Sequence, residues 1–452
     1  MKKTGVRMVA AAFVWSGRSS MPARATGLAQ TITLRAALKK FGLSLALAAL
    51  GLAPGARADT VTEWNANLER AIFATAQTPG AQPRFSAIVQ TAVYDAVNGI
   101  ARKYTPYFVT EPAPGGARPE AAAAQAAYTA LKALYPSQAA ALDAELADSL
   151  ASIPGSAGAS QSIARGRAWG EHVANVILAW RSTDGWSTPL PPYFGGGAPG
   201  IWRSPPTATN ADGTLPALFP QMAILVPFAM ASHDAFRPGP PPALTSALYA
   251  ADVNEVEAIG RFDSAIRTTD QTHLALLWQA VGVVDENRIA RSVVPDTNSL
   301  VDNARLFALL NISACDALIA GFDSKYAYNL WRPYHAIRLA DTDGNPDTVA
   351  DPTWDSLFLA PRFQEYISNH AALTGSFMHV LAHELGDEHT FTLSSPNSLY
   401  TWTFDRFSDA AARVKEARIW AGIHFRNSCD VGEAVGVAIA DFVVDNFFLP
   451  VD

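Results

Sequence analysis

The side chains best suited to chemistry lie between residues 325 and 424, where long cations alternate with histidines. In the first motif Lys325 and Arg332 are seven residues apart, and Pro333 follows directly. On a helix this spacing brings both cations within about 20° of one face. Proline disfavours helical geometry at the preceding residue, so we expect the helix to end at Arg332. Two cations would then converge at a helix terminus, although such a pair alone is more typical of solvated surface charge.

A second motif, Ser368-Asn369-His370, stands before an apolar run and predicts the start of a helix over 369–386. Ser368 or Asn369 suits the N-cap position. The free backbone N–H groups and positive dipole end of a helix N-terminus favour an anion. His370 would lie beside that anion, and its ordinary pKa range suits proton transfer. An N-capping Ser-Asn pair without any ligand explains the segment equally well.

The third motif runs from Arg418 through Gly422 to His424. Six residues is not a same-face helical spacing, so we expect a break at Gly422 that lets Arg418 and His424 converge. A neutral imidazole can bond directly to the central atom of an electrophilic oxyanion. Arginine suits the surrounding oxygens because its guanidinium donates in a planar, bidentate fork.

Three motifs follow one another within a hundred residues: Lys-x6-Arg-Pro, Ser-x-His and Arg-x5-His. Together they resemble the signature of the vanadium haloperoxidase and type 2 phosphatidic-acid phosphatase superfamily. The wider context resembles most its bacterial vanadium haloperoxidase-like branch. The segments similar to that branch are Trp331-Arg332-Pro333, Ala336-Ile337-Arg338, Ala421 to Arg426, Thr62 to Asn65 and Val93 to Asn98.

The resemblance implies a role for each motif residue around a bound vanadate or phosphate. His424 would be the covalent ligand of the central atom, His370 the acid and base near the opposite apex, and Phe363 an aromatic on the halide side. The groups implied to hold the oxyanion's oxygens are Lys325, Arg332, Ser368, the backbone N–H of Asn369, and Arg418.

The chain departs from the family's pattern at several positions. Asn369 stands where glycine is usual, which keeps the N–H donor but narrows the pocket. Ile367 replaces a common proline, and Ala417 replaces a serine that often precedes the arginine. Ser428 occupies the position, four residues after His424, of a common aspartate, so the group that orients His424 is not evident.

The activity implied by the resemblance is a vanadate-dependent haloperoxidase, which would use orthovanadate, hydrogen peroxide and a halide to make hypohalous acid for small organic acceptors. Lys325 would polarise the bound peroxide. The alternative is an acid phosphatase with a phosphohistidine intermediate at His424, because vanadate and phosphate share charge and shape and compete for one pocket. A third class, a non-catalytic oxyanion-binding protein, would leave both histidines without a role. Chain length and a long N-terminal bundle favour the peroxidase branch.

Three other motifs do not carry chemistry. His379 and His383 precede Glu384, but a zincin helix needs a histidine where Asp387 stands. The segment from Asp341 to Asn345 resembles the start of a calcium loop, yet Pro346 occupies the position of the required glycine, so a polar turn is expected. Ser368 and His370 are too close in sequence for a serine-hydrolase pair and lack its strand-turn-helix context.

Helical periodicity dominates and predicts an all-α fold of two helical bundles, the second carrying the oxyanion site. Residues 59–244 would form the N-terminal bundle, including a Pro/Gly-rich loop over 183–244 that wraps the surface or lines a site entrance. Residues 245–452 would form the haloperoxidase-like domain. Further helices are expected near 85–98, 119–133, 138–152, 160–180, 245–260, 269–284, 300–324, 407–421 and 430–448.

Residues 1–58 resemble an upstream extension followed by a signal peptide: Lys39 and Lys40, an apolar run over 41–53, then Ala56-Arg57-Ala58. This predicts a periplasmic or secreted protein. The segment holds nine Lys or Arg and no acid, so a chain of net charge −7 becomes one of −16 without it. So acidic a protein should repel nucleic acid and anionic membranes. No apolar run beyond the leader reaches the roughly 18 residues of a membrane span.

The chain has two cysteines, Cys315 and Cys429. In an exported protein they could form one disulfide, or they could be two small buried side chains.

Overall fold

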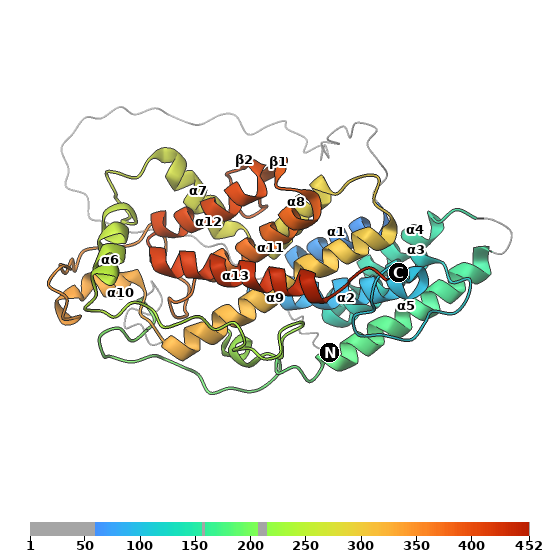
Figure 1. The fold of residues 1–452 in the computed structure, drawn as a ribbon, viewed down its shortest axis with the longest axis horizontal. Helices are drawn as coiled ribbons and strands as arrows, with labels where there is room; N and C mark the ends of the chain where they lie inside the picture. The colour runs from blue at the N-terminus through green and yellow to red at the C-terminus, as the bar shows by residue number, and fades with distance from the viewer. Residues whose placement is uncertain (1–58, 156–158, 207–214, 452) are drawn as a thin grey trace, which may run out of the picture. The chain divides into compact units, whose positions relative to one another are not determined.

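The computed structural model describes residues 59–155, 159–206 and 215–451, so the predicted leader lies outside the described residues. The described residues form one compact unit. It is built of helices with one small hairpin, which confirms the predicted all-α fold (Figure 1). The division into segments 59–244 and 245–452 remains a prediction.

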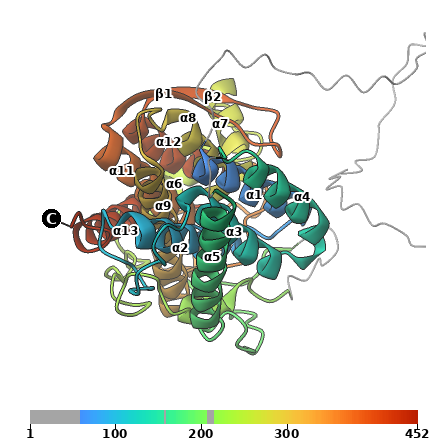
Figure 2. The same cartoon turned by 90° about the vertical axis from the view of Figure 1, so that its right-hand side faces the viewer.

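The first half of the described chain packs its helices around α2, α3 and α5 (Figure 2). Alanines dominate the buried face of α3, so helix axes can approach closely there. The elements of this half are α1 (Thr60–Ala74), α2 (Gln82–Ala101), α3 (Pro119–Leu134), η1 (Pro136–Gln138), α4 (Ala139–Ala151) and α5 (Ala159–Arg181).

The second half packs α9, α11, α12 and α13 against one another, and α9 also packs along α2 of the first half. Its elements are η2 (Pro220–Ile224), α6 (Ala247–Ile259), α7 (Thr269–Ala280), α8 (Val283–Val293), α9 (Leu300–Tyr328), α10 (Pro333–Arg338), η3 (Ala340–Thr342), α11 (Asn369–Leu385), β1 (Glu388–Leu393), β2 (Trp402–Arg406), α12 (Phe407–Trp420) and α13 (Arg426–Asn446).

Helix α9 is the central element of this packing. It is long and apolar enough by composition to cross a membrane, a feature that the search for uninterrupted apolar runs missed. Its most apolar stretch is, however, buried throughout within the protein. Neighbouring helices cover this stretch, which makes α9 a core helix.

The antiparallel hairpin of β1 and β2 was not expected from the sequence. Its register pairs Phe391 with Phe404 and Thr392 with Thr403. Phe391 and Leu393 are buried, whereas Thr390 and Thr392, on either side of Phe391, are exposed. This is the two-residue alternation of a half-buried strand. This alternating pattern is too short to be recognised in the sequence between two helices.

The loop over 183–244 follows the surface of the second half, with η2 as its helical turn in the described part. Asp316 on α9 fixes it: one carboxylate accepts hydrogen bonds from the backbone N–H groups of Phe228, Ala229 and Met230 at 2.8, 2.7 and 2.9 Å. Arg237 adds a bidentate ion pair with Asp323, also on α9. Phe219 of this loop lines the cavity described below, as predicted for a loop at a site entrance.

Replacing Asp316 should release this loop. Asp316→Ala leaves three buried backbone N–H groups without an acceptor, so we expect the free energy of unfolding to fall by about 3 kcal/mol. Guanidinium denaturation measures the change, and limited proteolysis should cut within 183–244 first. Asp316→Asn keeps one acceptor oxygen and should lose less. Equal stability of the alanine variant and the wild type would contradict the account.

Candidate functional site

Lys325 lies in the last turn of α9 and is fully buried. Its ammonium group donates hydrogen bonds to the carbonyl oxygens of Gln364 at 3.0 Å and Glu365 at 2.9 Å, and also to that of Ile367. Burial, followed by the nearby Arg332 guanidinium, lowers the pKa of Lys325 well below its ordinary value. Lys325 thus holds the irregular segment that leads into α11.

Arg332 reaches the same place by a route that differs from the prediction. Helix α9 ends at Tyr328, four residues earlier than expected, and Asn329 takes a left-handed conformation with φ +51°. Arg332 is extended and N-caps α10, as its position before Pro333 requires. Lys325 and Arg332 therefore do not share one helix. They converge because the chain reverses between them.

The Arg332 guanidinium is fully buried and donates hydrogen bonds to the carbonyls of Phe363 and Ile423, both at 2.8 Å. Its Nη1 also lies 2.9 Å from Nε2 of His424. Burial lowers the pKa of Arg332 to about 10. The face of the Phe363 ring lies over both cations, 5.3 Å from Lys325 Nζ and 5.0 Å from the Arg332 guanidinium carbon.

The third motif breaks where predicted. Helix α12 ends at Trp420, and Gly422 has φ +76°. A side chain at Gly422 would strain the backbone and would meet the Gly260 carbonyl oxygen at 2.5 Å. The turn directs Arg418 and His424 into the same buried region. Arg418 Nη1 donates to the Trp278 carbonyl at 3.0 Å, and burial lowers the pKa of Arg418 to about 9.

Glu365 orients His424, and sequence reasoning missed it. Its Oε1 lies 2.8 Å from His424 Nδ1 and also accepts the backbone N–H of Phe425 at 3.0 Å. With Nδ1–H donated to the carboxylate, Nε2 carries the lone pair. Ser428, which occupies the family's aspartate position, instead bonds the Glu365 carbonyl. What could have pointed to Glu365 in the sequence was its position shortly before Ser368, in a stretch of the chain that is buried.

Buried cations outnumber carboxylates at this place. Three cationic side chains surround one carboxylate, all buried, and several of their polar atoms have no hydrogen-bond partner among the described residues. Those atoms are Arg332 Nη2, Arg418 Nε and Glu365 Oε2. Burial and the neighbouring guanidinium groups hold the pKa of His424 well below its ordinary value, so the imidazole is neutral. The arrangement suits a compact oxyanion with a basic nitrogen facing its centre.

Helix α11 supplies the next residues. Ser368 is its N-cap, accepting the backbone N–H of Ala371 at 3.4 Å, and its hydroxyl lies against Cys429. Cys429 and Cys315 are both free and buried, so of the two alternatives for the cysteines the structure shows two small buried side chains.

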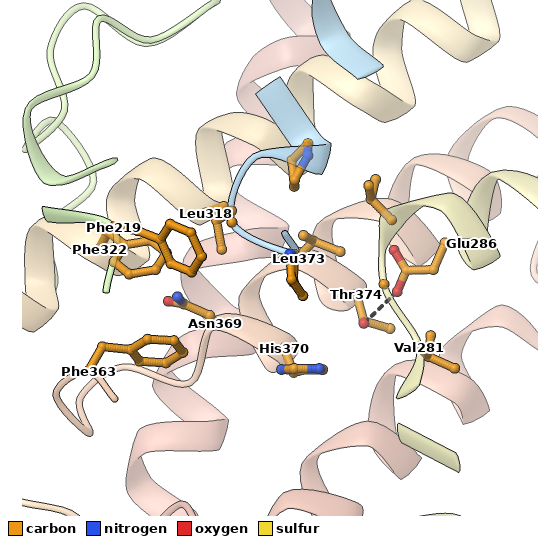
Figure 3. A pocket seen from close by; sticks show the side chains of 15 residues that line it. Phe219, Val281, Glu286, Leu318, Phe322, Phe363, Asn369, His370, Leu373 and Thr374 are labelled. Atoms are coloured by element: carbon orange, nitrogen blue, oxygen red, sulfur yellow. Dashed lines mark hydrogen bonds between the residues drawn. The ribbon is translucent and has the colours of Figure 1, made fainter. Parts of the chain in front are cut away.

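Beside the cations lies a cavity of about 90 Å³, lined by His370 and by largely apolar residues (Figure 3). Phe219, Phe322 and Phe363 form its aromatic side, with Phe322 making edge contacts to both other rings at 6.1 and 5.3 Å between centroids. Burial, followed by Arg418, lowers the pKa of His370 well below its ordinary value. The Val281 carbonyl accepts a hydrogen bond from the imidazole.

Asn369 also lines this cavity, and Gly321 of α9 makes room for it. A methyl group at Gly321 would lie 2.3 Å from Asn369 Oδ1. The larger residue at 369 is therefore matched by the absence of a side chain on the facing helix. That the Asn369 side chain narrows the pocket relative to glycine stays a prediction.

The discounted motifs lie elsewhere. His379 pairs with Asp441 at 2.6 Å and His383 with Glu384 at 3.2 Å, on largely exposed side chains. Asp343 accepts the backbone N–H of Asn345 at 2.7 Å within a polar turn, as predicted. Among the described residues, no group of three or more His, Cys, Asp or Glu side chains is placed to hold a metal ion.

Together the fold and this geometry define a class: an all-α protein with a buried cationic oxyanion site built from α9, the segment before α11, and the α12–α13 turn. Residues 305–450 match the family model of the VCPO second helical-bundle domain. Vanadium chloroperoxidase from Curvularia inaequalis is 35% identical over 92 residues, which are 18% of this chain and 14% of that protein. The sequence match thus spans a small part of that relative.

Solved structures extend the likeness to most of the chain. That of the first bacterial vanadium-dependent iodoperoxidase superposes with a TM-score of 0.73 at 22% identity, covering 87% of this chain and 97% of the other. The structure of an apo-type bacterial vanadium-dependent chloroperoxidase superposes with a TM-score of 0.64 at 17% identity, covering 80% of this chain and 92% of the other. The resemblance to the vanadium haloperoxidase superfamily is confirmed, and the fold is that of its bacterial members.

The contact between Glu365 and His424 should control oxyanion affinity. Removing the partner of a ligating histidine typically weakens binding roughly 10–100-fold, because the ring loses its orientation and basicity. We expect that loss for Glu365→Ala in titration calorimetry with orthovanadate, and a smaller loss for Glu365→Gln. Glu384→Ala, which removes a carboxylate bonded to Arg305 at the other end of α11, is the control. Equal affinities of Glu365→Ala and the control would refute the role.

Oxyanion affinity should also fall as pH rises from neutral. A bound anion raises the pKa of each surrounding cation, so affinity is complete below the anion-free pKa values and declines as pH passes through them. The lowered pKa of Lys325, and that of Arg418 at about 9, set this window. Sulfate, which does not titrate there, is the probe for calorimetry. Lys325→Met should flatten the profile, and a flat wild-type profile would contradict the account.

Proposed function

We propose that the protein is a vanadate-dependent haloperoxidase. One observation carries the proposal: Glu365 fixes His424 so that Nε2 presents a lone pair to a site lined by Lys325, Arg332 and Arg418. The unpartnered Arg332 Nη2 and Arg418 Nε are donors that a vanadate oxygen would satisfy. The residues present therefore fit the group.

His424 Nε2 would hold the vanadium. Lys325, Arg332, Arg418, Ser368 and the backbone N–H of Asn369 would hold the oxygens, as the motifs imply. Bound vanadate would supply an electrophilic centre that accepts hydrogen peroxide and passes oxygen to a halide. The surrounding cations stabilise the negative charge without changing their own positions, which is the main contribution of a preorganised site.

His370 would move the proton. Its pKa is lowered, so the ring is neutral, and the bond to the Val281 carbonyl occupies one ring nitrogen as donor. The other nitrogen is then a base that faces the cavity. It can take a proton from entering hydrogen peroxide, because a general base needs both a free lone pair and reach to the substrate.

The cavity favours small reactants. Its aromatic and aliphatic walls suit small reactants such as hydrogen peroxide and a halide. Phe363 would line the halide side. Small organic acceptors would be halogenated by the released hypohalous acid. The leader pattern and acidic charge support an exported protein that binds neither nucleic acid nor membrane.

Purified protein should brominate a phenolic dye with bromide and hydrogen peroxide only after orthovanadate is added. Hydrolysis of p-nitrophenyl phosphate, inhibited by vanadate, would instead support a phosphatase that forms phosphohistidine at His424 in the same site. Inactivity in both assays would leave a non-catalytic oxyanion-binding protein.

Variants separate binding from turnover. We expect His424→Ala to abolish tight vanadate binding, and retained affinity would refute its assignment as the ligand. His370→Ala should keep vanadate affinity but lower kcat by about 10²-fold or more, the usual contribution of a general acid–base group. Calorimetry and steady-state kinetics measure the two effects. An unimpaired kcat would remove His370 from the mechanism.

A further inference from the structure

A second ionisable group lines the cavity and is not explained by oxyanion binding. Glu286, on α8, is fully buried. The Thr374 hydroxyl donates a hydrogen bond to its Oε1 at 2.6 Å. Its Oε2 has no hydrogen-bond partner among the described residues. Figure 3 shows Glu286 and Thr374 on the side of the cavity opposite the three phenylalanines, with His370 between.

Two connections tie Glu286 to His370. Thr374 follows His370 by four residues on α11, and side chains at this spacing are neighbours on one helix face. Val281, whose carbonyl accepts from the His370 ring, also lines the cavity and lies two residues before Val283, the first residue of α8. The cavity has room for water, which can bridge the two side chains.

The surroundings keep Glu286 protonated. Burial raises its pKa to about 8, with the Thr374 hydrogen bond opposing this and the charge of Asp285 adding to it. The cations on and near α8 have other partners: Arg288 pairs with Glu69 and Asp285, and Arg291 pairs with Glu69. Because Oε1 accepts from Thr374, the proton resides on Oε2. A carboxylic acid kept neutral in an apolar site can donate a proton or hydrogen bond.

We propose that Glu286 is a second acid of this site, which returns protons to His370 through cavity water while Thr374 holds its carboxyl group. The inference rests on the proposed function, in which one halide, one hydrogen peroxide and one proton give one hypohalous acid and one water. His370 first passes the proton that it took from hydrogen peroxide to the oxygen that leaves as water. The O–H bond of Glu286 then breaks as a new N–H bond of His370 forms, and His370 passes this second proton to the oxygen that leaves in hypohalous acid. The carboxylate then regains its proton from water that enters the cavity.

The first test needs no turnover. Infrared difference spectra of wild type minus Glu286→Gln, taken at neutral pH, should show the carbonyl stretch of a protonated carboxylic acid. Adding orthovanadate should shift this band, since the new charge lies across a cavity that both groups share. A spectrum without the band, or a band insensitive to vanadate, would overturn the inference.

The second test is kinetic. Glu286→Gln keeps the shape and the acceptor for Thr374 but cannot supply a proton, so kcat should fall roughly 10-fold or more. Vanadate affinity should stay within about twofold of wild type, and the wild-type decline in kcat above about pH 8 should disappear. Thr374→Val, which removes only the bond that holds the carboxyl group, should lower kcat less, and Thr374→Ser should restore it. If Glu286→Gln does not fold, Thr374→Val and Thr374→Ser test the inference in its place.

The outcomes separate the two proposals. A wild type that oxidises no halide with vanadate refutes the proposed function and, with it, the proton-return role. An active wild type whose Glu286→Gln variant keeps the same kcat and pH profile overturns only the inference about Glu286.

Discussion

The burial of three cations beside a single carboxylate is the constraint on which the rest of this structure depends. Moving an ion from water into a protein interior costs several kcal/mol even after relaxation, and like charges add repulsion. The lowered pKa values of Lys325, Arg332 and Arg418 reflect that cost. An oxyanion placed among them would supply the missing negative charge.

The same cations hold the irregular backbone that forms the site. Lys325 bonds the carbonyls of Gln364 and Glu365, Arg332 bonds those of Phe363 and Ile423, and Arg418 bonds that of Trp278. These carbonyls lie outside regular hydrogen-bonding patterns and would be costly to bury unpaired. Each cation thus joins its own element to a segment that carries another site residue. Charge and backbone geometry are therefore coupled, and losing one cation disturbs both.

The sequence predicted much of this arrangement and failed where tertiary contacts decide. The all-α fold, the N-cap at Ser368 and the break at Gly422 were predictable because each depends on local residue types. The end of α9 was misplaced because the reversal at Asn329 overrides the boundary that Pro333 suggested. Glu365 was missed because its bond to His424 spans 59 residues, a pairing that no local pattern contains. Glu286 was missed for the same reason, since Thr374 lies 88 residues away.

The cationic site alone cannot distinguish vanadate from phosphate, so selectivity for a reaction must come from what adjoins it. Here the adjoining space is a small cavity with aromatic walls, a neutral imidazole and a buried carboxylic acid. Such a space admits small reactants and removes most of their water, which strengthens every electrostatic interaction inside. A phosphatase would instead need room for the leaving group of its substrate. The physical case for halide oxidation therefore lies in the cavity, whereas the case for oxyanion binding lies in the cations.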